Sequence, residues 1–227
     1  ERDGKYVYNT SDPTHKYLDG TETTQDDGTS PRRLQASTIA DELGYATNFQ
    51  SRTFSVSGKD RGAILLAGKT GKAFMYSTKT GRFTSTSYYM EKHPQWWDNF
   101  YATKPQDKWF HQRWNTLLEP KAYERSLPDG QTWSSQSRNM SRGMGHMYGL
   151  GEEKPGRLYY GTLLSSPFGD EAMVDFTLSM MKAEGIGANP KGAPDVLGVS
   201  FSGHDYINHQ YGPESVQSQD HLVRLDS

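Results

Sequence analysis

Short groups of apolar residues, separated by polar and glycine-rich stretches, predict strands and helices along most of the chain. The predicted strands are Lys5–Asn9, Ser51–Ser57, Ala73–Tyr76, Arg82–Thr86 and Asp195–Phe201. The predicted helices are Pro31–Gly44, a short helix or buried turn at Arg61–Ala67, Asp170–Glu184, and a helix after Pro213-Glu-Ser215. Helix, loop, strand and helix in succession near the C-terminus are typical of an α/β fold.

The spacing of apolar residues indicates which side of each element is buried. Residues three or four apart lie on one face of a helix, and alternate residues share one face of a strand. The expected buried residues of the helices are Leu34, Ile39 and Leu43, then Met173, Phe176, Met180 and Met181, and finally Val216, Val223 and Leu225. In the first central strand they are Phe54 and Val56, and the run Val196–Phe201 predicts a fully buried strand.

Between Tyr88 and Tyr160 the apolar residues recur with neither the spacing of a helix nor that of a strand. This region is rich in aromatic residues, with glycine, serine and arginine between them, and these are Trp96, Trp97, Phe100, Tyr101, Trp109, Phe110, Trp114 and Trp133. We expect this region to be an inserted cap whose aromatic residues fill its own core. The expected organisation is core in residues 1–87, cap in residues 88–160 and core again in residues 161–227.

Composition excludes several classes of function. The chain has 227 residues, with 25 basic and 27 acidic side chains, so its formal charge of −2 gives no electrostatic reason to expect nucleic acid or a membrane surface as partner. It has no apolar run near the ~18 residues that a membrane-spanning helix needs. Cysteine is absent, which excludes disulfides, thiolate metal sites and cysteine nucleophiles.

The most informative motif follows the last predicted strand. There the chain reads Ser-Phe-Ser-Gly-His-Asp-Tyr-Ile-Asn-His, so that Asp205 and His209 lie four residues apart. In open α/β sheets, functional groups collect beyond the carboxyl ends of strands, and carboxylate oxygen and imidazole nitrogen both suit zinc. Asp205 and His209 are therefore candidate metal ligands, although solvated polar residues of a connecting loop could have the same spacing.

A second motif follows the first central strand. Lys59 and Arg61 flank Asp60, and if the backbone stays extended there, residues two apart point the same way. Both cations could then face one anion, because arginine offers a planar fork to phosphate and lysine a point charge. The alternative is a surface cluster in which Asp60 neutralises its neighbours.

The other histidines have no partner at ligand spacing and are expected to be structural or exposed. They are His15, His93, His111, His146 and His221. His204 adjoins Asp205, and its role is left open.

Taken in order, these motifs resemble the alkaline phosphatase superfamily. The segments that carry the resemblance are Ser30-Pro-Arg-Arg-Leu34, Thr38-Ile-Ala-Asp-Glu-Leu43, Ser57-Gly-Lys-Asp-Arg-Gly-Ala-Ile-Leu65, Ser87-Tyr-Tyr-Met90 and Ser200–Ser215. The chain is most similar to the phosphate-irrepressible, monoesterase branch of the type I phosphodiesterase/nucleotide pyrophosphatase group. The resemblance covers nearly the whole chain.

The resemblance implies a doubly wound α/β core, of which this chain is an internal part, and a hydrolase with two Zn²⁺ ions per complete enzyme. Asp205 and His209 resemble two ligands of one zinc, and Lys59 and Arg61 resemble the catalytic, substrate-binding pair that contacts phosphoryl oxygens. The family's Thr or Ser nucleophile and an Asn beside it are expected before Glu1. The ligands of the second zinc, and a further His for the first, are expected after Ser227.

The implied function is hydrolysis of small phosphate monoesters through a covalent Thr or Ser phospho-enzyme. A monoester carries two negative charges, which favours a site with two cations. Two alternatives stay open: a phosphodiesterase or nucleotide pyrophosphatase, and a non-catalytic module of the same fold. The family's tendency implies a periplasmic or secreted protein, and residues 1–227 alone are expected to be inactive.

Overall fold

The computed structural model describes residue 4, residues 6–132 and residues 143–227. The chain divides into two compact units. Unit 1 comprises Glu1–Ser77, Arg82–Thr103 and Met173–Ser200, and unit 2 comprises Thr78–Gly81, Lys104–Ala172 and Phe201–Ser227. Trp133 lies outside the described residues.

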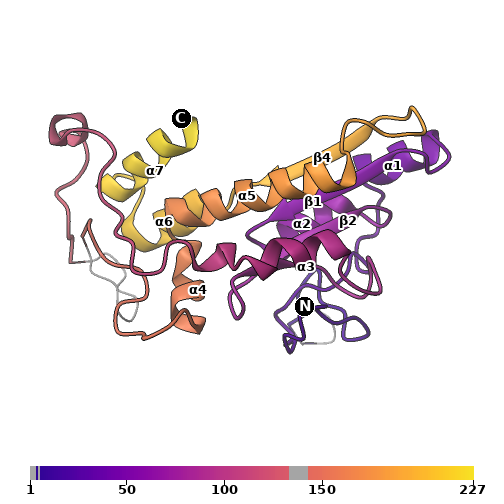
Figure 1. Cartoon of the computed structure of the whole chain (residues 1–227), viewed down its shortest axis with the longest axis horizontal. Helices are drawn as coiled ribbons and strands as arrows, with labels where there is room; N and C mark the ends of the chain where they lie inside the picture. The colour runs from indigo at the N-terminus through magenta and orange to yellow at the C-terminus, as the bar shows by residue number, and fades with distance from the viewer. Residues whose placement is uncertain (1–3, 5, 133–142) are drawn as a thin grey trace. The chain divides into compact units, whose positions relative to one another are not determined.

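Among the described residues, all the strands belong to unit 1, and helices occur in both units (Figure 1). The strands are β1 (Arg52–Ser57), β2 (Lys72–Ser77), β3 (Arg82–Thr84) and β4 (Asp195–Ser200). The α-helices are α1 (Ile39–Ala46), α2 (Asp60–Ala67), α3 (Gln95–Ala102), α4 (Arg157–Leu163), α5 (Pro167–Glu184), α6 (Gly203–Tyr211) and α7 (Val216–Asp226). Short 3₁₀-helices lie at η1 (Pro105–Asp107) and η2 (Pro120–Tyr123).

The strands of the described residues form one sheet in the order β3-β2-β1-β4. β1 is parallel to both β2 and β4, whereas β2 and β3 form the antiparallel hairpin that the sequence predicts. In the register of β1 and β4, Ser57 lies opposite Ser200. Because the two strands are parallel, the chain leaves β1 and β4 at the same edge of the sheet.

One face of the sheet is covered by α2. Ala73 and Met75 of β2 pack there against buried apolar residues of α2, which are Ala63, Ile64 and Ala67. β1 presents serines to this helix, and Ser55 Oγ donates to the carbonyl of Ala63 at 2.6 Å. Because serine side chains are small, α2 approaches β1 closely.

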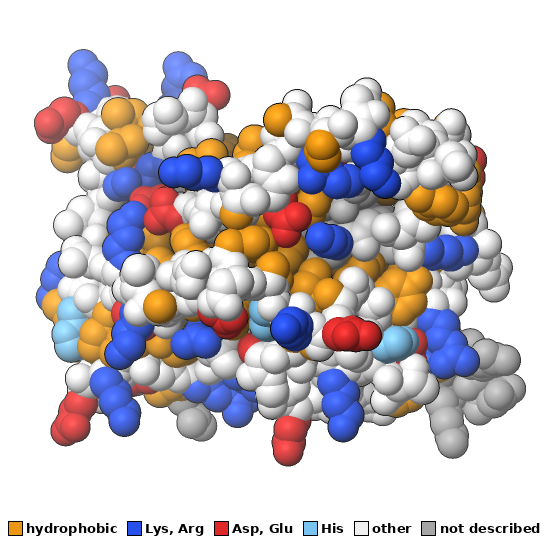
Figure 2. Space-filling view, turned by 45° about the vertical axis from the view of Figure 1, so that its right-hand side comes forward, with side chains coloured by type: hydrophobic (Ala, Val, Ile, Leu, Met, Phe, Trp, Pro, Cys, Tyr) orange, Lys and Arg blue, Asp and Glu red, His pale blue; other side chains and the backbone are white. Residues whose placement is uncertain are grey.

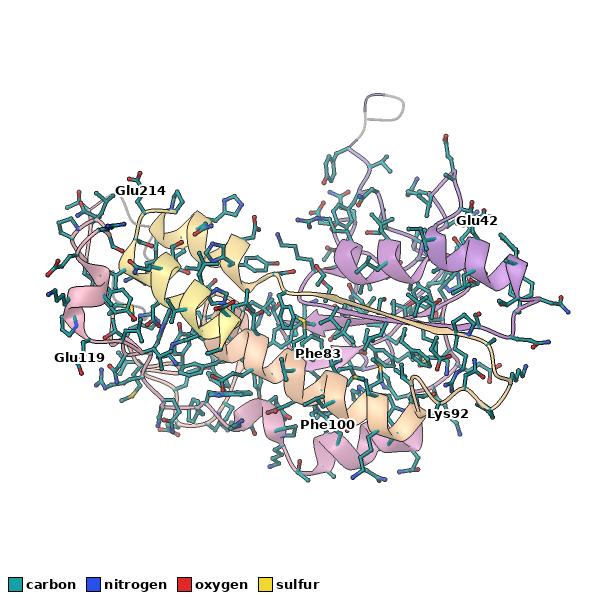
Figure 3. All side chains as sticks on the ribbon, turned by 90° about the horizontal axis from the view of Figure 1, so that it is seen from above. Glu42, Phe83, Lys92, Phe100, Glu119 and Glu214 are labelled. Carbon is teal, nitrogen blue, oxygen red and sulfur yellow. The ribbon has the colours of Figure 1, made fainter. Side chains whose placement is uncertain are left out.

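The opposite face carries the aromatic residues of unit 1. Phe74 of β2 contacts Phe176 edge-to-face at a centroid distance of 5.3 Å, and Phe83 of β3 stacks on it at 5.1 Å. Aromatic rings of α3 complete this cluster, and they are Trp96, Phe100 and Tyr101; Phe83 and Phe100 are labelled in Figure 3. The sheet thus has helices on both faces, as the α/β prediction requires, and these aromatic residues fill a core.

Unit 2 has long irregular segments, and a buried carboxylate orders them. Asp220 of α7 accepts hydrogen bonds from Trp114 Nε1 at 2.7 Å, the Leu117 amide at 2.6 Å and the Tyr123 hydroxyl at 2.6 Å. Arg224 Nε donates to the same carboxylate at 2.7 Å. These bonds hold the pKa of Asp220 below its ordinary value, although burial opposes ionisation.

Two predicted boundaries are wrong. The part of the Lys5–Asn9 strand that is described, residues 6–9, is not a strand, because the chain turns there and the Ser11 amide donates to the carbonyl of Tyr8. The Pro31–Gly44 helix is shorter and is α1. Its start is set by Thr38, whose Oγ1 accepts the Asp41 amide, while the Asp41 carboxylate accepts the Thr38 amide in return.

The predicted buried faces were partly wrong as well. Met173, Phe176 and Met180 are buried, but Ile39 is 85% exposed and the buried residues of α7 are polar, namely Gln217, Ser218, Asp220 and His221. β4 is only half-buried along its length, because within the described residues it pairs with β1 alone. The spacing of apolar residues does not predict the buried face of α7, because hydrogen bonds, and not apolar contacts, hold that helix in place.

On the surface, charges of both signs are interspersed over the face shown in Figure 2. This agrees with the nearly balanced composition. None of the helices in the described part of the chain combines the length and apolarity that crossing a bilayer requires.

Candidate active site

Lys59 and Arg61 lie where β1 ends and α2 begins. Lys59 is the N-cap residue, with extended backbone, and its amide donates to Ser57 Oγ at 3.1 Å. The helix begins at Asp60, so Arg61 already belongs to its first turn. The extended backbone that was expected to align the two cations therefore ends at Lys59, and the pair occupies the cap and the second helical position instead.

The tight approach of α2 to β1 fixes this turn. A side chain at Gly62 would collide with Ser57 Oγ and would also lie 3.4 Å from Ser200 Oγ. Glycine at this position therefore lets the first turn of α2 sit directly on the strand ends. The amino end of a helix also favours anions, because its free amides and its dipole both attract negative charge.

Asp205 and His209 lie on successive turns of α6. His209 Nε2 and Asp205 Oδ1 are 3.6 Å apart, and the two side chains are 80% and 51% exposed. The structure thus brings together the two residues that the sequence pairs by their spacing. Lys59 and Arg61 belong to unit 1, whereas Asp205 and His209 belong to unit 2.

The geometry of Asp205 and His209 fits two ligands of one zinc. Bonds of ~2.0–2.1 Å at a tetrahedral angle put two ligand atoms about 3.4 Å apart, close to the observed 3.6 Å. Both side chains are exposed enough to bind an ion. Among the described residues, no group of three or more His, Cys, Asp or Glu is placed to hold a metal. A catalytic zinc usually has three protein ligands, so this pair alone would not complete such a site.

A buried network beside the start of α6 was missed by the sequence analysis. His221 Nε2 lies 2.8 Å from Asp170 Oδ2, and His221 Nδ1 lies 3.3 Å from Nδ1 of His204. Burial, together with the neighbouring His221, lowers the pKa of His204. A side chain at Gly203 would lie 2.6 Å from Asp170 Oδ2, which explains the glycine before His204. No local signal reveals this network, because its members are 17 and 51 residues apart.

The remaining histidines serve the packing or lie near the surface. His93 stacks on Trp97 at 3.8 Å and contacts Thr84 Oγ1 through Nε2 at 3.1 Å. Burial lowers its pKa to about 4. His146 is buried and its pKa is also lowered by burial, whereas His15 and His111 are partly or largely exposed.

Comparison with known proteins decides the family. Residues 3–227 match the family described as type I phosphodiesterase / nucleotide pyrophosphatase. The chain belongs to this family. Its relatives support the assignment to the alkaline phosphatase superfamily, and to its monoesterase branch, that the sequence motifs indicate.

Three curated relatives illustrate this similarity. Alkaline phosphatase PhoV of Synechococcus elongatus is 37% identical over 199 residues, which are 87% of this chain and 35% of the relative. Alkaline phosphatase PafA of Elizabethkingia meningoseptica is 34% identical over 228 residues, or 98% of this chain and 40% of the relative. A protein of Myroides odoratus named calcium-transporting ATPase is 34% identical over 200 residues, or 87% of this chain and 36% of the relative.

Solved structures confirm the α/β fold. The crystal structure of wild-type PafA matches with a TM-score of 0.82 at 30% identity, covering 97% of this chain and 42% of PafA. A PafA variant with four substitutions matches with a TM-score of 0.84 over the same shares. The chain therefore spans less than half the length of the relatives and structures that it matches.

Proposed function

We propose that this chain is part of a zinc-dependent phosphatase that hydrolyses phosphate monoesters. The observation that carries the proposal is the pairing of Asp205 and His209, 3.6 Å apart on the helix that follows β4. Two relatives named alkaline phosphatase support the reaction class. The nucleophile, a Thr or Ser that forms a covalent phospho-enzyme, would come from outside residues 1–227, as would the ligands of a second zinc.

In this proposal Lys59 and Arg61 bind the non-bridging oxygens of the phosphoryl group. Support comes from their place at the amino end of α2 and from the PafA variant, in which a lysine and an arginine two positions apart were both replaced by alanine. The two cations would neutralise the dianionic monoester more fully than they would a singly charged diester. Bound zinc would supply Lewis-acid polarisation of the reacting oxygens.

The test of the phosphate-binding pair is Arg61→Ala in the complete protein. Loss of one preorganised donor costs roughly 10²–10³ in rate, and we expect most of that loss with a monoester such as p-nitrophenyl phosphate. Turnover of the diester bis(p-nitrophenyl) phosphate should fall much less. Equal losses for both substrates would refute the role of Arg61 and favour the phosphodiesterase alternative.

The test of the metal ligands is the double substitution of Asp205 and His209 by alanine. Elemental analysis should show bound zinc falling from two toward one per chain, because one of the two sites loses two ligands. Glu214→Ala, an exposed carboxylate of the same unit, is the matched control and should leave zinc content unchanged. An unchanged stoichiometry in the double variant would show that the assignment is wrong.

The proposed location is the periplasm or the cell exterior. It follows the family's tendency, and cell fractionation with a periplasmic marker enzyme would test it. A small phosphate monoester is the proposed partner.

A further inference from the structure

Asp60, between Lys59 and Arg61, gathers donors from distant parts of unit 1. Its Oδ1 accepts the hydroxyl of Tyr8 at 2.6 Å and the amide of Arg61 at 2.5 Å. Its Oδ2 accepts the amide of Gly28 at 2.5 Å. These bonds tie two segments of the N-terminal region to the amino end of α2. Asp60 therefore does more than neutralise Lys59 and Arg61, which is the role it would have in a simple surface cluster.

The hydroxyl of Tyr8 links this carboxylate to the guanidinium of Arg61. It donates its proton to Asp60 and accepts a hydrogen bond from Arg61 Nη1 at 3.2 Å. Burial, reinforced by the bond to Asp60, raises the pKa of Tyr8 to about 12. The hydroxyl therefore keeps its proton at neutral and moderately alkaline pH, and its direction stays fixed.

Close packing shows that the cluster is specifically built. A side chain at Gly28 would lie 2.8 Å from Asp60 Oδ2 and would collide with Thr10 Oγ1. Only glycine lets the backbone approach the carboxylate this closely. The carboxylate that accepts the Tyr8 hydroxyl is thus held in place by the close approach of the N-terminal region.

We propose that Tyr8, oriented by Asp60, is a positioning residue that holds the Arg61 guanidinium toward the phosphoryl group. Arginine has several rotatable bonds and loses rotamer entropy when it binds an anion. A hydrogen bond to one of its five N–H groups reduces that cost, and the fork geometry then directs the others. This inference rests on the proposed function, because it assumes that Arg61 binds phosphate.

The decisive experiment compares Tyr8→Phe with Tyr17→Phe in the complete protein. Tyr17 belongs to the same N-terminal region, and its hydroxyl donates to the carbonyl of Gly28 at 3.0 Å. Tyr17→Phe therefore removes a similar hydroxyl from the same packing without touching Asp60 or Arg61. Both variants keep the aromatic ring, and thermal unfolding should confirm that both fold.

We expect Tyr8→Phe to lower kcat/KM for p-nitrophenyl phosphate roughly five- to tenfold, the effect of one hydrogen bond. The inhibition constant of inorganic phosphate should rise by a similar factor. Diester turnover and zinc content should stay unchanged, and Tyr17→Phe should match the parent protein in every assay. In the double variant, Tyr8→Phe should add nothing to Arg61→Ala, because the residue acts through that guanidinium.

Three outcomes would overturn the inference. The first is full additivity of Tyr8→Phe and Arg61→Ala, the second is equal loss with monoester and diester, and the third is the same loss in Tyr17→Phe. If Arg61→Ala itself spares monoester turnover, the proposed function fails and the inference fails with it. If Arg61→Ala is selective and Tyr8→Phe has no effect, only the inference fails.

Discussion

Units 1 and 2 differ in the kind of hydrogen bond that holds their backbone in place. In unit 1, backbone bonds between strands define the sheet, and α2 and an aromatic cluster cover its faces. In unit 2, side chains from distant segments converge on buried groups such as Asp220 and the pair of Asp170 and His221. Order in a sheet spreads over many equivalent bonds, whereas order around a carboxylate depends on one residue.

The sharpest test of this difference is Asp220→Ala. Several donors, among them the buried Trp114 and Tyr123, would lose their acceptor, and each unsatisfied buried group costs about 1–3 kcal/mol. We expect the free energy of unfolding to fall by roughly 4 kcal/mol, measured by urea denaturation. Hydrogen exchange should accelerate around residues 114–123 and stay slow in β1 and β2. Exchange that rises equally in both units would contradict the comparison.

Glu124→Ala is the matched control, because this exposed carboxylate lies beside the same irregular segment. Surface substitutions usually change stability by less than about 0.5 kcal/mol. A loss in this variant as large as that in Asp220→Ala would indicate a general sensitivity of the segment to charge.

The corresponding test in unit 1 is Arg52→Ala. Arg52 binds the buried carboxylate of Asp195 through Nε at 3.0 Å and Nη2 at 2.6 Å, and donates to the carbonyls of Glu184 and Gly185. Removing one partner of such a pair costs about 3 kcal/mol. We expect less than that, about 2 kcal/mol in urea denaturation, because the Gly187 amide and Asn189 still bind Asp195. Hydrogen exchange should rise at the β1–β4 pairing and not in α7.

Arg52→Lys separates charge from geometry in this test. Lysine keeps the charge but cannot make the two-pronged contact, so it should recover less than half of the lost stability. Full recovery would show that only the charge matters.

The same contrast explains which features the sequence predicts. Strand β1, helix α2, the β2–β3 hairpin and α5 follow from local period and turn residues, because local contacts define them. The network around Asp220 joins residues 97 to 106 positions apart through their side chains, and no local pattern encodes such pairs. For this reason, the prediction of which face of α7 is buried was wrong.

The candidate site divides in the same way. The four-residue spacing of Asp205 and His209 places both on one side of α6, as the sequence suggests. Tyr8 is 53 residues from Arg61, and His221 is 51 residues from Asp170. Contacts of this kind depend on tertiary packing, so only the structure reveals them.

A third test asks whether irregular segments of unit 1 also depend on buried carboxylates. Burial disfavours the charged form of Asp12, but hydrogen bonds from Thr14 and Ser30 prevail and lower its pKa from 3.8 to about 2. Such a carboxylate stabilises the folded state at pH values above its unfolded pKa. This stabilisation is lost as the pH falls from about 4 through 2. The size of this contribution is about 2 kcal/mol.

The measurement is the free energy of unfolding at pH 5, 4 and 3 for the parent protein and Asp12→Asn. The variant lacks this titration, so the difference between the two proteins should shrink as pH falls. A difference that stays constant over this range would mean that Asp12 acts by shape alone, and that this irregular segment of unit 1 does not depend on the charge of its buried carboxylate.

The smallest expected effect concerns the start of α1. Thr38 Oγ1 accepts the Asp41 amide at 3.2 Å, and Asp41 also binds the amides of Lys69 and Thr70 at 2.7 and 3.0 Å. Thr38→Ala removes the cap and the hydrogen bond from the Thr38 hydroxyl to Asp41 Oδ2, and should cost about 1 kcal/mol in urea denaturation. Thr38→Ser keeps the hydroxyl and should recover nearly all of it. Because Asp41 continues to join α1 to the end of α2, hydrogen exchange should rise in the first turn of α1 alone. A rise that extends into α2 would show that order in unit 1 also depends on single residues, and the contrast between the units would then be one of degree.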